Sequence, residues 1–157
     1  MKESVISFSG GMDSSALLLD LLSSGYRVHC ITFKYSQKHI IEVERAKSNI
    51  GYLGQNGFSD KLIHKVISIE DVFSKFNSSL IDEGQSIPEG YYEEESMIST
   101  FVPNRNAIFS SIIYGYSLSL SSKKKEKIIL GLGVHAGDHS IYPDCRPDFY
   151  ELLESAF

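Results

Sequence analysis

A cluster of small and hydroxyl-bearing residues, Ser9-Gly10-Gly11-Met12-Asp13-Ser14-Ser15, separates two apolar runs near the start of the chain. Glycines let backbone N–H groups approach an anion without obstruction by a Cβ atom, and serine hydroxyls add further donors. A helix that begins directly after such a loop contributes a favourable dipole. These residue types predict a phosphate site, while a turn in which Asp13 and Ser14 only cap the helix would use similar residues.

Two other nucleotide-binding motifs are less consistent with the sequence. A Walker A loop requires a Gly-Lys pair after its glycines, and no such pair follows Gly11. The glycine spacing of a dinucleotide-binding motif does occur at Gly131–Ala136, but residues 137–144 are not expected to open a helix. The serine- and glycine-rich loop is therefore the stronger candidate for a phosphate site.

The elements that must position this loop follow from the apolar spacing. Short β-branched runs predict strands at Ser4–Phe8, Val28–Phe33, Lys61–Ile69 and Lys127–Leu132. Helical periodicity predicts helices at Ser14–Ser23, Ile40–Leu53 and Asn104–Leu120. Strands that alternate with helices predict an α/β fold, a parallel twisted sheet with helices on both faces and with ligands at the carboxyl ends of the strands.

Two further segments complete this interpretation. The polar residues 77–100 are expected to form a mobile loop. A last helix is expected to begin at Pro147 and to bury an apolar stripe made of Phe149, Leu152, Leu153 and Phe157.

Composition indicates one globular domain in a reducing compartment. The chain has 157 residues, of which 42% are hydrophobic and 22% charged. Its net charge of −5 gives no reason to expect a nucleic-acid partner, and no apolar stretch approaches the roughly 20 residues of a membrane span. The two cysteines, Cys30 and Cys145, do not form a CxxC pair. We expect a cytoplasmic protein with no membrane partner.

The order of residues in the loop at Ser9–Ser14 is similar to the SGGxDS loop, or PP-loop, of the N-type ATP pyrophosphatases. Those enzymes cleave ATP between the α and β phosphates and adenylate a substrate oxygen. Three further stretches resemble blocks of the 7-cyano-7-deazaguanine synthase family: Tyr35–His39, Phe101–Asn106, and Gly133–Asp138 running into Tyr142–Pro147. The resemblance covers essentially the whole chain and implies a Rossmann-like fold of the adenine nucleotide alpha hydrolase type.

The resemblance also implies a reaction, the ATP-dependent carbon–nitrogen ligation that makes 7-cyano-7-deazaguanine for queuosine biosynthesis. Its substrates would be 7-carboxy-7-deazaguanine, ATP and ammonia. Adenylation would give the carboxylate a good leaving group that ammonia displaces, and a second adenylation on the amide oxygen would allow elimination to the nitrile. Mg²⁺ as a companion of ATP and a homodimeric assembly are implied as well.

Carried over residue by residue, the resemblance implies three groups of site residues. ATP would be bound by Phe8, Ser9, Gly10, Gly11, Met12, Asp13, Ser14, Ser15, Ala16, Leu17 and Leu18. The catalytic candidates are Lys38, His39, Arg105 and Asp138, and the substrate contacts are Gln37, Tyr142, Asp144 and Arg146. His39 and His135 are candidates for orienting ammonia or moving a proton, because a neutral imidazole can do either.

The chemistry of three of these side chains suits the implied roles, and each also has a structural interpretation. Arg105 has a planar fork that fits the α-phosphate or a carboxylate, or it is a surface arginine at a helix start. Asp144 would accept hydrogen bonds from a guanine-like edge and Arg146 would bind the substrate carboxylate, or the two close a proline-rich turn. Cys145 is assigned no covalent step, since adenylation requires no thiol.

The sequence departs from the family pattern at Ser36, where glycine is usual, and at Lys38, where arginine is usual. Family members continue into a segment with a four-cysteine site for Zn²⁺, so with two cysteines we expect no metal site here and a shortened PP-loop domain over residues 1–157. Weak nitrile formation is then expected. Two alternatives stay open: another PP-loop ATP pyrophosphatase that acts on RNA, and a non-catalytic nucleotide-binding remnant.

Overall fold

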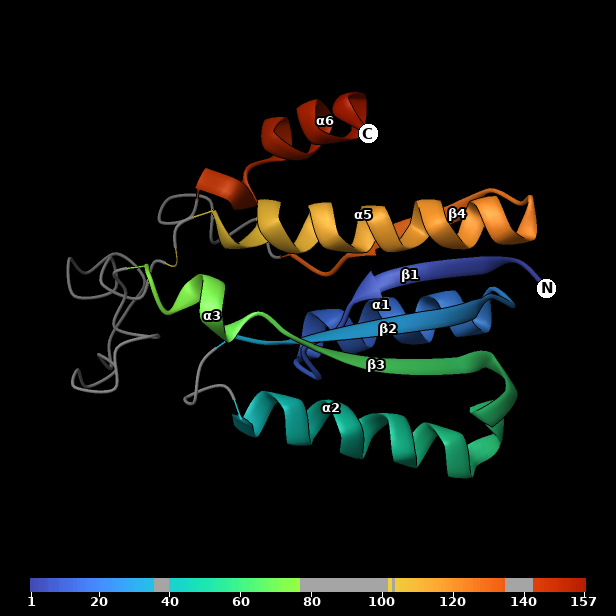
Figure 1. Ribbon diagram of the computed structural model, residues 1–157. Coiled ribbons are helices and arrows are strands. Elements are labelled where there is room, and N and C mark those ends of the chain that lie inside the picture. The colour runs from blue at the N-terminus through green and yellow to red at the C-terminus, as the bar shows by residue number, and fades with distance from the viewer. Residues whose placement is uncertain (36–39, 77–101, 103, 135–142) are drawn as a thin grey trace.

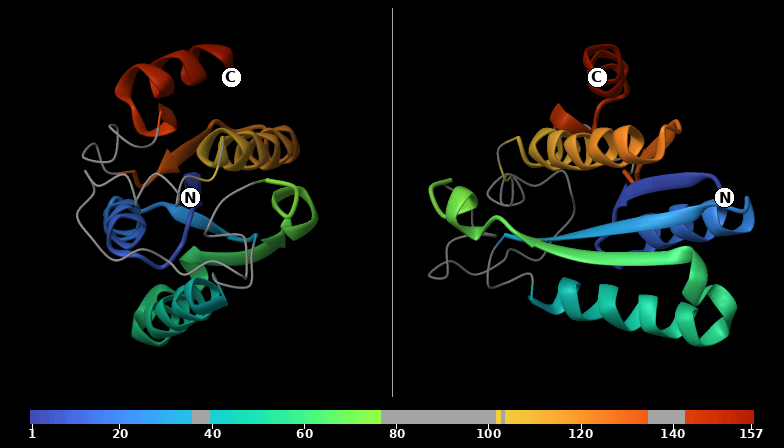
Figure 2. Two further views of the ribbon diagram at one scale, coloured as in Figure 1. Left: turned by 90° about the vertical axis from the view of Figure 1, so that its left-hand side faces the viewer. Right: turned by 45° about the vertical axis from the view of Figure 1, so that its right-hand side comes forward.

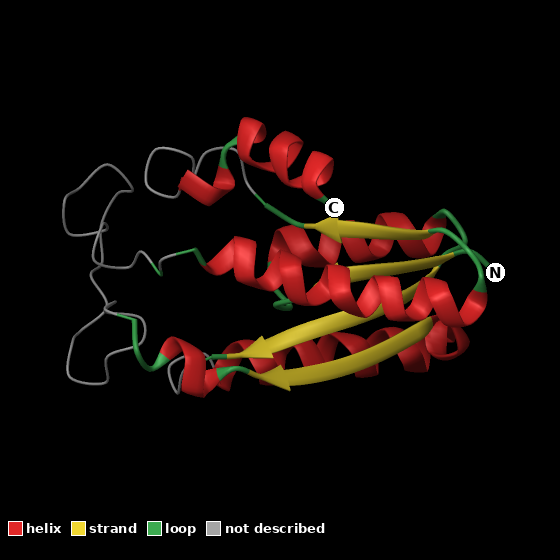
Figure 3. Cartoon of the chain, turned by 45° about the horizontal axis from the view of Figure 1, so that its top comes forward, coloured by secondary structure: helices red, strands yellow, loops and turns green. Residues whose placement is uncertain are grey.

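The computed structural model describes residues 1–35, 40–76, 102, 104–134 and 143–157. Within them a four-stranded parallel sheet has the order β3-β2-β1-β4 (Figure 1). Its strands are β1 (Glu3–Ser7), β2 (Arg27–Lys34), β3 (Leu62–Ser68) and β4 (Ile128–Leu132). All four strands point toward the same edge of the sheet, as the arrowheads in Figure 3 show. The predicted parallel sheet is confirmed.

Helices cover both faces of the sheet, as predicted. On one face lie α1 (Met12–Ser23) and α2 (Ile40–Leu53), and on the other lies α5 (Arg105–Lys124), which the left view of Figure 2 separates. The outermost helix is α6 (Pro147–Ala156). Four short elements were not predicted: η2 (Gly54–Phe58), η3 (Ser59–Lys61), α3 (Glu70–Phe73) and η5 (Pro143–Cys145). No described helix is both long and apolar enough to cross a membrane.

The two faces of the sheet carry separate apolar clusters, because successive strand side chains point in opposite directions. Val5 packs in the cluster under α5, and its neighbour Ile6 packs in the cluster under α1 and α2. In the first cluster the rings of Phe33 and Phe109 stack with centroids 4.1 Å apart. The second is built around Leu18, Leu22, Val28, Cys30 and Ala46. The polar stretch 77–100, predicted to be a mobile loop, lies outside the described residues.

A buried polar network joins β1, β2 and α5 at the amino-terminal edge of the sheet. Glu3 and His29 are only 2% and 3% exposed, and His29 Nε2 lies 2.9 Å from Glu3 Oε2. His29 Nδ1 lies 2.8 Å from the hydroxyl oxygen of Tyr116. Because a carboxylate only accepts, Nε2 carries the proton and the Tyr116 hydroxyl donates to Nδ1. Lys124 and Arg27 also pair with the Glu3 carboxylate.

The surroundings of this network lower the pKa of both groups. Burial lowers the pKa of His29, and the charges of Lys124 and Lys65 add to this, against the opposite influence of Glu3. Burial alone would raise the pKa of Glu3, but hydrogen bonds and charges from Lys124 and His29 together bring it below its ordinary value. The folded protein therefore holds a neutral imidazole beside an ionised carboxylate.

The last helix forms where it was predicted, with Pro147 in its first turn, but the predicted apolar stripe packs only in part. Leu152 is 72% exposed, and no residue of α6 is fully buried. Leu153 and Phe157 of the predicted stripe face α5 and β4, and Tyr150 lies beside them there. Phe157 stacks on Tyr114 with ring centroids 4.1 Å apart, and this contact sets the rotation of the helix.

The buried network predicts that the fold loses stability on mild acidification. Unfolded His29 takes up a proton below about pH 6.5, whereas folded His29, with its lowered pKa, takes it up only at lower pH. The free energy of unfolding should therefore fall from about pH 7.5 to about pH 5.5, by at most about 1.4 kcal/mol per pH unit for this one proton. Urea titrations at both pH values measure the change.

A His29→Gln variant is the matched control, because glutamine keeps a hydrogen-bonding side chain and does not titrate. Its stability should depend less on pH over the same interval. His64, whose pKa is also lowered by burial, titrates in both proteins, so only the difference between them reports on His29. Identical pH dependence in the two proteins would contradict the assignment.

Candidate functional site

The loop between β1 and α1 lies against the backbones of two other segments. Gly10 has a φ of +77°, and a Cβ atom there would lie 2.6 Å from the backbone nitrogen of Ala46 in α2. On the other side, a Cβ atom on Gly133, which follows β4, would lie 2.8 Å from the backbone nitrogen of Ser14. Both positions require glycine, since real Cβ atoms do not approach backbone atoms so closely. The loop is thereby held at the carboxyl edge of the sheet.

The serine hydroxyls of the loop bond mainly to the loop itself. Ser9 Oγ accepts the N–H of Gly11 at 3.2 Å and lies 3.2 Å from Ser14 Oγ. Ser14 Oγ donates to the carbonyl of Gly11 at 3.2 Å, and the Ser14 residue is 5% exposed. Ser14 is therefore buried, and its hydroxyl proton is used within the loop. Asp13, by contrast, is exposed.

Helix α1 begins without a side-chain cap. Its N-cap residue is Gly11, and no side chain accepts a hydrogen bond in the capping position. The turn in which Asp13 or Ser14 only caps the helix is thus not what the structure shows. The first N–H groups of an uncapped helix point toward the loop, and together with the helix dipole they favour an anion.

Asn49 on α2 is a loop-holding residue that the sequence analysis missed. Its Nδ2 donates to the carbonyl of Gly10 at 3.1 Å and to Ser15 Oγ at 3.4 Å. The sequence did offer one indication of this role: Asn49 is a polar residue on the apolar side of the predicted helix, between Ala46 and Ile50. The amide group satisfies a carbonyl that the left-handed turn at Gly10 leaves without a secondary-structure partner.

Beside the loop lies a cavity of about 190 Å³ at the carboxyl ends of β1, β2 and β4. Its polar lining includes Ser9, Ser14 and Thr32, and the charged residues that line it within the described chain are Glu42 and Arg105. The apolar walls come from Phe8, Phe33, Tyr35, Phe109, Leu132 and Val134. The structure thus brings Arg105, a predicted catalytic residue, to the same cavity as the predicted ATP loop. Such a site combines phosphate-binding groups with aromatic walls.

Asp144, predicted to contact the substrate, is buried against the start of α5. Its Oδ2 accepts the backbone N–H of Asn106 at 2.8 Å. Asn106 Nδ2 in turn donates to the carbonyl of Asp144 at 3.3 Å and to Cys145 Sγ at 3.2 Å. The short helix η5 therefore caps α5 from a distant part of the chain. Asp144 and Arg146 are not among the described residues that line the cavity, and Arg146 is the exposed N-cap of α6.

The other predicted site residues, Gln37, Lys38, His39, His135, Asp138 and Tyr142, lie outside the described residues. Their roles stay predictions. The described chain stops before these segments at Tyr35 and Val134, and both of those residues line the cavity.

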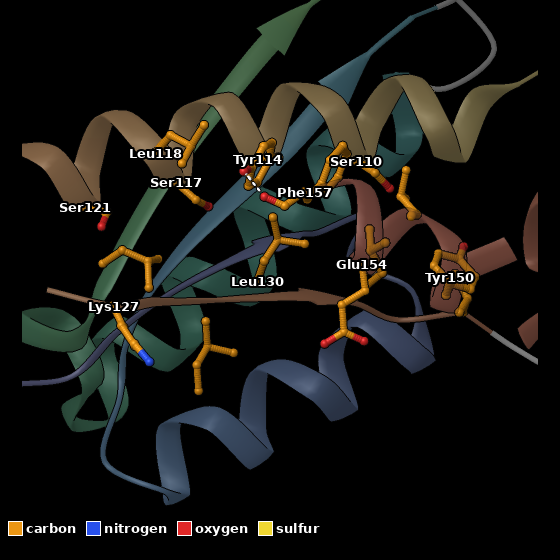
Figure 4. Close-up of a pocket in the computed structure, with 15 residues that line it drawn as sticks. Ser110, Tyr114, Ser117, Leu118, Ser121, Lys127, Leu130, Tyr150, Glu154 and Phe157 are labelled. Atoms are coloured by element: carbon orange, nitrogen blue, oxygen red, sulfur yellow. Dashed lines mark hydrogen bonds between the residues drawn. The ribbon is translucent and has the colours of Figure 1, made fainter. Parts of the chain in front are cut away.

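A larger cavity, of about 780 Å³, lies between α5, β4 and α6 (Figure 4). Leu130, Leu153 and Phe157 make it mainly apolar, and Tyr114 donates a hydrogen bond to the Phe157 carbonyl across it. The hydroxyls of its lining residues Ser110 and Ser117 donate to backbone carbonyls of α5 itself. Size alone would favour this cavity, but none of the described residues that line it belongs to the loop at Ser9–Ser14. The smaller cavity, which that loop lines, is therefore the better candidate site.

Among the described residues no group of three or more histidine, cysteine, aspartate or glutamate side chains is placed to hold a metal ion. Cys30 and Cys145 are both buried, and burial raises the pKa of the Cys30 thiol to about 12. The donor set present in this part of the chain does not fit a zinc site.

Comparison with known proteins identifies the family. The sequence profile described as "Queuosine biosynthesis protein QueC" matches residues 3–157. The chain belongs to the QueC family. The loop at Ser9–Ser14 and the cavity beside it are therefore features of a QueC-family chain.

The QueC-family chain is similar over nearly all its length to curated proteins named 7-cyano-7-deazaguanine synthase. It is 43% identical over 150 residues to the one from Caldicellulosiruptor saccharolyticus, covering 96% of this chain and 61% of that protein. It is 40% identical over 155 residues to the one from Methanoregula boonei, covering 99% and 66%. The chain thus spans about three fifths of the length of the first of these relatives.

A solved structure shares the fold. It is described as a predicted subunit of tRNA methyltransferase from Methanocaldococcus jannaschii, with a TM-score of 0.59 and 21% sequence identity. The match covers 99% of this chain and 64% of that one. At this level of identity the likeness concerns the architecture alone.

The contact between Gly10 and α2 predicts a steric cost for any side chain at this position. Gly10→Ala should lower the free energy of unfolding by about 1–3 kcal/mol more than Gly25→Ala does, because only the first introduces a clash with backbone atoms. Gly25 is the matched control, since its φ of +82° carries the same left-handed strain with no atom within 4 Å of the added Cβ. Urea unfolding of both variants measures the difference, and equal losses would contradict the packing described.

Proposed function

We propose that this chain carries the nucleotide site of an enzyme that converts 7-carboxy-7-deazaguanine and ammonia to 7-cyano-7-deazaguanine at the expense of ATP, in queuosine biosynthesis. The observation that carries the proposal is the family match over residues 3–157. The uncapped start of α1 and the glycine-dependent loop in front of it support the proposal, because they provide a compact site for phosphates.

ATP would be bound by the segment from Phe8 to Leu18, with its phosphates on the loop before α1 and on the first turn of that helix. The uncapped N–H groups at the start of α1 would donate to phosphate oxygens, and the dipole of α1 would favour their charge. The exposed carboxylate of Asp13 would help to hold Mg²⁺ beside the phosphates. When bound, Mg²⁺ neutralises charge on the phosphates.

Arg105 would act on the reacting end of the nucleotide. It lines the cavity together with Ser9 and Ser14, and its guanidinium can hold two oxygens of the α-phosphate or of the substrate carboxylate. Aromatic walls from Phe8, Phe33 and Phe109 would exclude water from the adenylated intermediate, which water would otherwise hydrolyse. Ammonia would then displace AMP, and a second adenylation would allow elimination to the nitrile.

The remaining assignments belong to the same proposal. Lys38, His39 and Asp138 are proposed as further catalytic residues, and Gln37, Tyr142, Asp144 and Arg146 as substrate contacts. We also propose that residues 1–157 form one PP-loop domain, that the enzyme is a cytoplasmic homodimer, and that its substrates are small molecules. The net charge of −5 supports the last point, since nucleic-acid binders carry a basic excess.

The test is incubation of the protein with ATP, ammonium and 7-carboxy-7-deazaguanine, followed by mass spectrometry of the products. Formation of AMP together with the nitrile supports the proposal. Release of ADP in place of AMP, or formation of AMP only when RNA is added, would overturn it.

Arg105→Lys should lower kcat/KM for this reaction by about tenfold to a hundredfold, because a point charge cannot reproduce a two-pronged contact with an oxyanion. Steady-state rates of AMP release measure the effect. Arg45→Lys is the matched control, since Arg45 is exposed on α2 and does not line the cavity. If both variants keep wild-type rates, Arg105 has no part in binding the reacting groups.

A further inference from the structure

A chain of hydrogen bonds connects β3 with the start of the phosphate loop. Thr32 Oγ1, on β2, donates to the backbone carbonyl of Phe8 at 2.7 Å. His64 Nε2, on β3, lies 2.8 Å from the same Thr32 Oγ1. Thr32 is 2% exposed, so water does not compete for its hydroxyl.

The direction of these bonds follows from the number of protons available. A carbonyl oxygen only accepts, so the single hydroxyl proton of Thr32 is used on Phe8. The Thr32 oxygen must then accept from His64, and the ring proton of His64 therefore lies on Nε2. The neutral ring is consistent with this arrangement, because burial and the charge of Lys47 lower the pKa of His64.

The acceptor at the end of this chain, Phe8, directly precedes Ser9 and Gly10. Its own N–H donates to the carbonyl of Ile31 at 2.8 Å, so β2 holds Phe8 by both its N–H and its carbonyl. Thr32 and Phe8 both line the cavity, whereas His64 does not. His64 thus reaches the cavity through two residues: it hydrogen-bonds to Thr32, and its ring lies edge-on to that of Phe8 with centroids 6.4 Å apart.

We propose that His64 is a positioning residue for the nucleotide: through Thr32 it fixes the carbonyl of Phe8, and thereby the path of the loop that binds the phosphates. The inference rests on the proposed function, since it concerns the same ATP site. Without a donor at His64, the Thr32 hydroxyl is free to turn away from Phe8, and the start of the loop loses one of its two attachments to β2.

The test compares three variants by calorimetric titration with Mg²⁺ and ATP. His64→Leu removes the donor, His64→Gln places an amide N–H near the position of Nε2, and His64→Asn reaches only the position of Nδ1. We expect the dissociation constant for ATP to rise by about threefold to tenfold in the leucine and asparagine variants, the effect of one hydrogen bond. The glutamine variant should bind ATP nearly as tightly as the wild type.

Rescue by glutamine separates the positioning role from general packing. Leucine has nearly the volume of histidine but no donor, so a loss of affinity in His64→Leu that glutamine restores comes from the missing donor and not from a change in volume. Thermal unfolding of each variant shows whether it is folded at the titration temperature. The inference is overturned if His64→Leu binds ATP with wild-type affinity, or if His64→Gln is as weak as His64→Leu.

A second measurement requires no nucleotide. The ¹⁵N chemical shifts of the His64 ring, identified by their loss in His64→Gln, should show a protonated Nε2 and an unprotonated Nδ1 at neutral pH. A proton on Nδ1 would overturn the order of hydrogen bonds. If the wild-type chain binds no ATP, the proposed function and the positioning role fall together, whereas equal ATP binding by wild type and His64→Leu removes only the role of His64.

Discussion

The close contact of three backbone segments at the carboxyl edge of the sheet is the constraint on which the candidate site depends. The loop after β1 lies between the backbone of α2 at Ala46 and Gly133 beyond β4, at distances that leave no room for a Cβ atom on Gly10 or Gly133. Asn49 from α2 satisfies the carbonyl of Gly10. The start of α1 is therefore held in place by contacts with other backbone segments, without a side-chain cap.

The buried polar network and the candidate site lie at opposite edges of the sheet. At the amino-terminal edge, Glu3 and His29 bury a fully hydrogen-bonded polar network that ties β1 and β2 to α5. At the carboxyl edge, the helix start without a side-chain cap lies beside the cavity that Arg105 lines. The same strands connect the two edges, so the ion network helps to hold the register that positions the loop.

The start of α5 connects the cavity proposed to bind the nucleotide with Asp144, a proposed substrate contact. Arg105 lines the cavity, and the next residue, Asn106, is fastened to Asp144 by its backbone N–H and its side chain. A carboxylate with this contact stabilises the helix that carries Arg105. Asp144 therefore has a structural role even where a second carboxylate oxygen contacts a substrate, and its loss would affect the position of Arg105 as well.

Apolar periodicity in the sequence determined the alternation of strands and helices, because burial against a sheet requires a period of two in strands and 3.6 in helices. The loop at Ser9–Ser14 was recognised from its own residues, because the order of its glycines and serines is a local property of the sequence. Asn49 and Gly133 contact that loop, and His64 bonds to Thr32, which holds Phe8 directly before it. These contacts join positions far apart in the chain, so local sequence patterns do not predict them. Only the tertiary structure decided which side chain of α6 packs beside Leu153 and Phe157. Tyr150 and Leu152 both fit helical spacing, and the position of α5 and β4, far away in the sequence, places Tyr150 against them and leaves Leu152 exposed.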